Sequence, residues 1–178
     1  MQEPMPDAAG PTGFGPAGRA LMLACKVAAV AGGLVFVALV LMSIVSIVGR
    51  KLWSVPVPGD LELMQMGAAV GSSAFFAYCH LVRGDVKVDF FTQHWKASRV
   101  AVLDAIGSLL VGLFGALITW RTTVGAISLF SDGETSAILG WPIWLAQALM
   151  IPGFVLLAAA GFYMSWHFVG KARSGSVA

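Results

Sequence analysis

Residues 27–48, VAAVAGGLVFVALVLMSIVSIV, carry no charged side chain. A helix needs about 20 consecutive, mostly apolar residues to cross the roughly 30 Å hydrocarbon core of a bilayer, and this run satisfies that requirement. Three further stretches also satisfy it: residues 63–82, residues 100–120 with Asp104 in their second turn, and a helix within residues 135–170. The sequence therefore predicts an all-α integral membrane protein with four transmembrane helices.

The composition excludes several classes of function. Hydrophobic residues make up 58% of the chain and charged residues only 11%, which is not the composition of a soluble domain. The chain has no CxxC, HExxH or phosphate-binding loop, and no paired carboxylates that resemble a catalytic site. Cys25 and Cys79 fall near predicted helix ends, where no disulfide is expected. We expect neither an enzyme nor a resident cofactor or metal.

The basic residues divide unevenly between the two sides of the membrane. One side holds eight of them: Arg19, Lys26, Arg83, Lys87, Lys96, Arg99, Lys171 and Arg173. The other side holds only Arg50, Lys51 and Arg121. Because the side richer in basic residues is cytoplasmic, we expect both termini in the cytoplasm, with loops at residues 49–61 and about 121–140 facing outward.

The chain divides into three parts by composition. Residues 1–23 are rich in proline and glycine and predict a flexible N-terminal tail, residues 24–170 form the membrane domain, and residues 171–178 form a C-terminal tail. The first apolar run is about twice as long as the hydrophobic region of a signal peptide, so we expect it to be retained.

Residues 55–66, VPVPGDLELMQM, place two carboxylates at the start of the second helix. Pro58 suits the first helical turn, where its missing N–H costs nothing, and Gly59 precedes the two acids. Asp60 and Glu62 complement the free N–H groups and the positive dipole at a helix N-terminus. Arg50, a short turn away, is able to pair with one of them. We expect both acids to lock the hairpin of the first two helices.

Residues 83–99, RGDVKVDFFTQHWKASR, have two interpretations. Val88, Phe91 and Trp95 recur at helical intervals among basic residues, which favours a short amphipathic helix at the cytoplasmic interface. The alternating VKV is also typical of a short extended piece before such a helix. In the favoured interpretation Asp89 caps or pairs locally.

Small residues mark faces where helices approach closely. Gly67 and Gly71 form a GxxxG pattern in the second helix, and Gly112 and Gly115 punctuate the third. This pattern does not identify the partner of each face. Pro152 is expected to kink the fourth helix or to leave a carbonyl for a neighbour.

An ordered series of motifs resembles the small membrane subunit of tripartite ATP-independent periplasmic (TRAP) transporters. The motifs are IVSIVGRKLW with Arg50, PVPGDLEL, the pair Phe75 and Phe76, RGDVKVDFF, and ETSAILGWPIW, whose Pro142 leads into the fourth helix. Together they extend over roughly residues 30–165. One departure is Asp85, where the family commonly has histidine, so that position is assigned no role.

The resemblance implies a division of labour among three proteins. In such systems a secreted binding protein captures an organic acid in the periplasm, a large multi-helix permease subunit carries the substrate and sodium sites, and the small subunit braces the large one. The residues of this chain agree, because its sequence shows no interrupted helix pair, no polar cluster at mid-membrane and no deep arginine to hold a carboxylate.

Two other functions compete with this one. His80 and His167 end the second and fourth helices near the same leaflet, where two imidazoles can ligate a haem, as in the membrane-anchor cytochrome of a respiratory complex. The simpler interpretation is that each histidine is a polar tip in the headgroup region. A self-contained exporter requires a carboxylate deep in a helix, and Asp104, the one candidate, lies too near the inner end.

Overall fold

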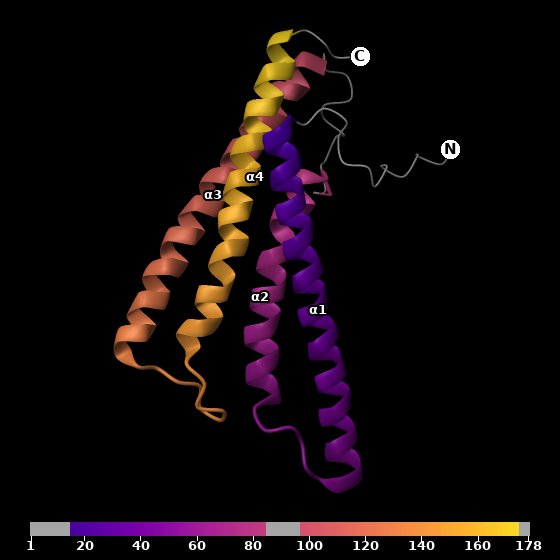
Figure 1. The fold of residues 1–178 in the computed structure, drawn as a ribbon, viewed down its shortest axis with the longest axis vertical. Coiled ribbons are helices and arrows are strands. Elements are labelled where there is room, and N and C mark those ends of the chain that lie inside the picture. The colour runs from indigo at the N-terminus through magenta and orange to yellow at the C-terminus, as the bar shows by residue number, and fades with distance from the viewer. Residues whose placement is uncertain (1–14, 85–96, 175–178) are drawn as a thin grey trace, which may run out of the picture.

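The computed structural model describes residues 15–84 and 97–174, and it consists of four helices (Figure 1). Their bounds are α1 Pro16–Trp53, α2 Asp60–Leu81, α3 Ala97–Asp132 and α4 Ile143–Ser174. The expected all-helical fold is therefore present throughout the described part of the chain. The predicted interfacial helix, with Asp89, lies outside the described residues.

Two helices extend further than the sequence suggested. α1 continues to Trp53 and α3 continues to Asp132, so Arg50, Lys51 and Arg121 are helical, and the expectation that they lie in loops is wrong. The physical reason is that no proline interrupts either extension and that arginine and lysine are good helix formers. α3 ends only where Gly133 adopts a positive φ of 65°.

α1 also begins early. It starts at Pro16, which occupies the first helical position and has Gly15 as its N-cap residue. Proline is favoured there because its fixed φ suits a helix and its missing N–H has no intrahelical partner. The first turns of α1 thus lie in the stretch that the sequence assigned to a tail, and the division of the chain into domains stays a prediction.

The helices form two hairpins that lie side by side. α2 packs between α1 and α4, and α3 packs on α4. Residues 54–59 and 133–142 connect the hairpins' helices at one end of the molecule, called here the loop end, and the hairpins diverge toward it (Figure 1). The opposite end is called the far end.

Three of the described helices are long and apolar enough to cross a membrane. They are Pro16–Trp53, Arg99–Asp132 and Ile143–Gly170. Large apolar side chains cover their outer surfaces; Leu34 of α1 and Phe114 of α3 are more than half exposed. Such surfaces suit a lipid environment, and the chain is a membrane protein. α2 has 22 residues, a length that also suffices, but it is more polar.

The buried core lies toward the far end. Its members come from all four helices: Cys25, Ala77, Leu81, Ala105, Phe154, Leu157, Ala160, Met164 and Phe168. At this end the Arg83 guanidinium lies 3.6 Å from an Asp104 carboxylate oxygen and 4.5 Å from the centre of the Phe168 ring. Arg83 therefore joins α3 and α4 at the point where α2 ends.

The GxxxG pattern of α2 is used inside the chain. A Cβ atom at Gly71 would lie 2.7 Å from the Phe36 ring of α1, and one at Gly67 would lie 2.9 Å from Leu39. Both glycines therefore face α1, and the close approach of the two helices depends on them. This face is not available to another subunit.

Candidate functional site

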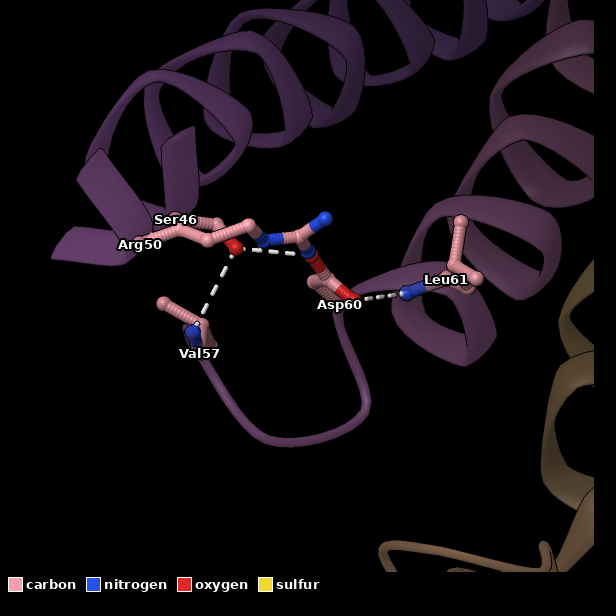
Figure 2. Close-up of polar contacts among 5 residues, drawn as sticks. All are labelled: Ser46, Arg50, Val57, Asp60 and Leu61. Atoms are coloured by element: carbon pink, nitrogen blue, oxygen red, sulfur yellow. Dashed lines mark hydrogen bonds and ion pairs between the residues drawn. The ribbon is translucent and has the colours of Figure 1, made fainter. Parts of the chain in front are cut away.

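Asp60 is the centre of a polar cluster at the loop end (Figure 2). Its Oδ2 atom accepts a hydrogen bond of 2.6 Å from the Ser46 hydroxyl and lies 3.1 Å from Nη2 of Arg50. Its Oδ1 atom accepts a bond of 2.9 Å from the Leu61 N–H. The expected pairing of Arg50 with an acid is present, and it joins the end of α1 to the first turn of α2.

Ser46 gives this cluster its second support. Its side chain is buried, donates to Asp60 and accepts a bond of 3.3 Å from the N–H of Val57 in the connecting loop. The sequence predicted no polar role for Ser46. The signal that identifies its role is the spacing of four residues between Ser46 and Arg50, which places both side chains on one face of α1.

The start of α2 differs from the expectation. The helix begins at Asp60 and Gly59 is its N-cap residue, so Pro58 precedes the helix and its assignment to the first helical turn is wrong. Gly59 adopts a φ of 70°, in the left-handed region that suits glycine. This conformation reverses the chain just before α2, where a residue with a fixed φ near −65° could not stand.

Glu62 holds the two hairpins together. It accepts hydrogen bonds from the backbone N–H groups of Ile138, at 2.9 Å, and Leu139, at 3.2 Å. The expectation that it locks the hairpin of α1 and α2 is wrong. Its partners lie 76 and 77 residues further along the chain, in the loop between α3 and α4.

The loop of residues 133–142 is folded so that it can meet Glu62. Thr135 and Pro142 form an antiparallel bridge, and the Ser136 N–H donates to the Trp141 carbonyl at 2.7 Å. Pro142 stands directly before α4, as the family resemblance implied. Because these contacts close the base of the loop, the N–H groups of Ile138 and Leu139 at its tip remain for the carboxylate.

Both carboxylates are ionised at neutral pH. The hydrogen bond from Ser46 is the main cause that lowers the pKa of Asp60, and it is assisted by the Leu61 N–H and by Arg50. Desolvation raises the pKa of Glu62, but the bonds from Ser136, Ile138 and Leu139 outweigh it, and the pKa is lowered. The charged forms therefore make these contacts.

The Glu62 contact is expected to weaken in acid. Because its pKa is lowered in the folded chain, its contribution to stability is complete above about pH 5 and is lost as the pH falls below about 4. Amide hydrogen exchange at Ile138 and Leu139, taken as the ratio of the wild type to Glu62→Gln at each pH, measures this. A ratio that does not change between pH 7 and the acid range would contradict the assigned contact.

Two glycines provide a matched test of the contact between the loops. A Cβ atom at Gly59 would lie 2.5 Å from Cγ of Leu139, whereas Gly133, with a similar φ of 65°, has no such neighbour within 4 Å. Both alanine variants carry the cost of the left-handed conformation, about 1–2 kcal/mol. Only Gly59→Ala also pushes the loops apart, so we expect its loss of thermal stability to be clearly larger. Equal losses would show that the loops do not meet here.

The contacts of this cluster indicate a structural role, because they hold helices and loops of the chain together. Its carboxylates accept bonds from donors of the same chain, and among the described residues no group of histidine, cysteine and acidic side chains is placed to hold a metal ion. His80 is buried at the end of α2, and His167 lies partly buried on α4.

A protein-family model matches residues 39–170 of this chain, and its description is tripartite ATP-independent periplasmic transporters, DctQ component. The chain belongs to the DctQ family. The resemblance seen in the sequence is thereby confirmed, and the matched range contains the whole loop-end cluster. No curated protein and no solved structure matches the chain.

Membership of the DctQ family determines the class of function. The chain is a membrane component of a transporter, the small permease of the TRAP type, and the family is not one of enzymes. The alternative of a haem-binding anchor with His80 and His167 as ligands receives no support from this match.

Proposed function

We propose that the chain is the small permease subunit that braces a large multi-helix permease subunit in the bacterial inner membrane. The complex imports organic acids by sodium symport after a periplasmic binding protein has delivered them. In this proposal all four helices, α2 included, cross the bilayer, and both termini are cytoplasmic.

The observation that carries the proposal is the continuity of the four helices. Membrane transporters typically build substrate and ion sites from interrupted helices, whose free backbone groups bind the solutes. Each of α1 to α4 is one unbroken helix, and α4 continues through Pro152. An organic anion requires partners when it leaves water, so the substrate is held by another subunit.

The surface of the chain supports a bracing role. α1 has 38 residues and α3 has 36, which correspond to about 57 and 54 Å at 1.5 Å per residue. Both exceed the roughly 30 Å of hydrocarbon, so they tilt or extend beyond it. Long, stiff helices with exposed apolar sides are suited to lie along a larger membrane subunit.

Reconstitution into liposomes tests the proposal. Uptake of the cognate acid is followed under an inward sodium gradient while each component is omitted in turn. We expect uptake only when the large subunit, the small subunit and the loaded binding protein are all present. Uptake by the 178-residue chain alone would overturn the bracing role, and undiminished uptake without it would show that the brace is dispensable.

The orientation has its own test. Reporter fusions after Arg99 and after Lys171 are expected to report the cytoplasm, and a fusion at Ser54, between α1 and α2, is expected to report the periplasm. The reason is the excess of basic residues on the first side. A periplasmic signal at Arg99 would contradict the four-helix topology.

A further inference from the structure

The charged residues of α1 are all basic. They are Arg19 and Lys26 near the far end and Arg50 and Lys51 near the loop end, and the helix contains no acidic residue. At the loop end Arg50 has Asp60 as its partner. At the far end Arg19 and Lys26 are exposed, and no acidic residue of the described ranges forms an ion pair with either of them.

The packing of α1 fixes the direction in which these two side chains point. Gly18 and Cys25 are buried, and Cys25 belongs to the core. Arg19 and Lys26 each follow one of these buried residues, so they lie about 100° further around the helix. Seven residues separate them, which corresponds to about two turns or roughly 10 Å along the axis. Both basic residues therefore lie on one flank of α1, turned away from the core.

The described part of the far end does not supply a counter-charge for this flank. Asp104 is the one acidic residue in the described ranges outside the loop end, and it already lies 3.6 Å from the guanidinium of Arg83. Asp104 also belongs to α3, which packs on α4 and does not contact α1 in the described part of the chain. The positive charge of Arg19 and Lys26 therefore favours an anion from outside the described chain.

The same flank becomes apolar directly below Lys26. Residues 27–48 carry no charge, and on this flank Val30 is 58% exposed and Val37 is 56% exposed. Helical side chains lean toward the N-terminus of their helix, so the amino group of Lys26 points away from the apolar stretch. Along α1 the order is thus two cations followed by an exposed apolar stripe. A phospholipid with a net negative headgroup has the complementary order, whereas a soluble anion matches only the cations.

We propose that this flank of α1, formed by Arg19, Lys26, Val30 and Val37, binds a phospholipid whose headgroup carries a net negative charge. The phosphate accepts hydrogen bonds from the two basic side chains, which are long enough to approach it from both sides along the axis. An acyl chain lies along the two valines. This inference does not depend on the transport function, since it concerns what the chain binds in the bilayer.

Native mass spectrometry of the full-length chain tests the proposal. The chain is released from micelles that contain phosphatidylglycerol, phosphatidylcholine or phosphatidylethanolamine with identical acyl chains. We expect phosphatidylglycerol to be retained about twentyfold better than the two zwitterionic lipids, because each basic side chain at an anionic headgroup contributes about fivefold. Equal retention of the three lipids would overturn the proposal without any variant.

Single variants locate the site. Arg19→Gln and Lys26→Gln are each expected to reduce the retention of phosphatidylglycerol about fivefold, and Lys26→Arg, which keeps the charge, is expected to preserve most of it. Arg99→Gln is the matched control, because it removes the same charge from an exposed residue at the same end, on a helix that does not contact α1 in the described part of the chain. Equal losses in Lys26→Gln and Arg99→Gln would show a diffuse attraction to the whole far end and would overturn the assigned flank.

The same measurement on the complex with the large subunit separates lipid from protein as the occupant. If the flank binds lipid, phosphatidylglycerol stays bound in the complex and its retention still depends on Lys26. Loss of the lipid when the large subunit is added would show that protein covers this flank, which also overturns the proposal.

Discussion

Replacing Gly161 with leucine is expected to force α3 away from α4 and to destabilise the folded chain strongly. A Cβ atom at position 161 would lie 2.5 Å from the Cα atom of Gly112 and 2.8 Å from the carbonyl oxygen of Ser108, and these are backbone atoms that no rotamer change can move aside. This contact lies in the interface between α3 and α4, which is the most extensive helix–helix interface in the described part of the chain. The expected loss is at least about 3 kcal/mol, the upper part of the range for overpacked cores.

The control for this variant is Gly107→Leu in α3. Gly107 has no such neighbour within 4 Å of a Cβ position, so the added side chain meets open space. Both variants gain the same helix propensity, roughly 0.8–1 kcal/mol relative to glycine, and the comparison cancels this gain. Thermal unfolding of the purified chain measures the difference. Similar midpoints for the two variants would show that α3 and α4 are further apart than described.

Removal of both loop-end carboxylates, by Asp60→Ala together with Glu62→Ala, is expected to lower the assembly of the transporter. The first change removes the polar contacts between the end of α1 and the first turn of α2, and the second removes the hydrogen bonds between α2 and the loop of residues 133–142. The α1–α2 hairpin then loses its polar contacts at the loop end and its hydrogen bonds to the other hairpin, so the surface offered to the large subunit is no longer fixed. We expect most of the complex to be lost in co-purification, with an unchanged substrate preference in the remainder.

Single variants and a control make this result specific. Since Asp60 and Glu62 make separate contacts, their individual effects are expected to add. Asp132→Ala removes a carboxylate at the same end whose recorded bond, 3.2 Å from the Ser128 hydroxyl, lies within its own helix, and it is expected to leave the yield unchanged. The swap, Arg50→Asp together with Asp60→Arg, is expected to give a higher yield of the complex than either charge reversal alone. An altered substrate preference with a normal yield would instead give these residues a role in transport.

Features set by short stretches of chain could be predicted from the sequence. The apolar runs identified the helices because a membrane imposes their length. The pairing of Arg50 with an acid could be predicted because Arg50 and Asp60 are ten residues apart across one short connection. The position of Pro142 before α4 was implied by the family resemblance of ETSAILGWPIW, which is a stretch of consecutive residues.

Features set by contacts between hairpins could not be predicted in this way. Glu62 has a role that depends on how a loop 76 residues away folds, and no local pattern encodes that shape. The GxxxG pattern identified Gly67 and Gly71 as a contact face, but the choice of α1 as the partner depends on the order in which the helices pack. Pro58 was misplaced because Gly59, with its positive φ, takes the capping position.

The position of α2 between α1 and α4 has a consequence for the insertion of the protein into the membrane during its synthesis. α2 is the most polar of the four helices, with Gln65, Ser72 and Ser73 in its sequence, and a segment of this kind enters the bilayer poorly by itself from the translocon. α1 is already synthesised when α2 emerges and can accompany it as a hairpin. α4, its other neighbour, leaves the ribosome only after α3, so α2 waits through the synthesis of a whole helix with one flank uncovered.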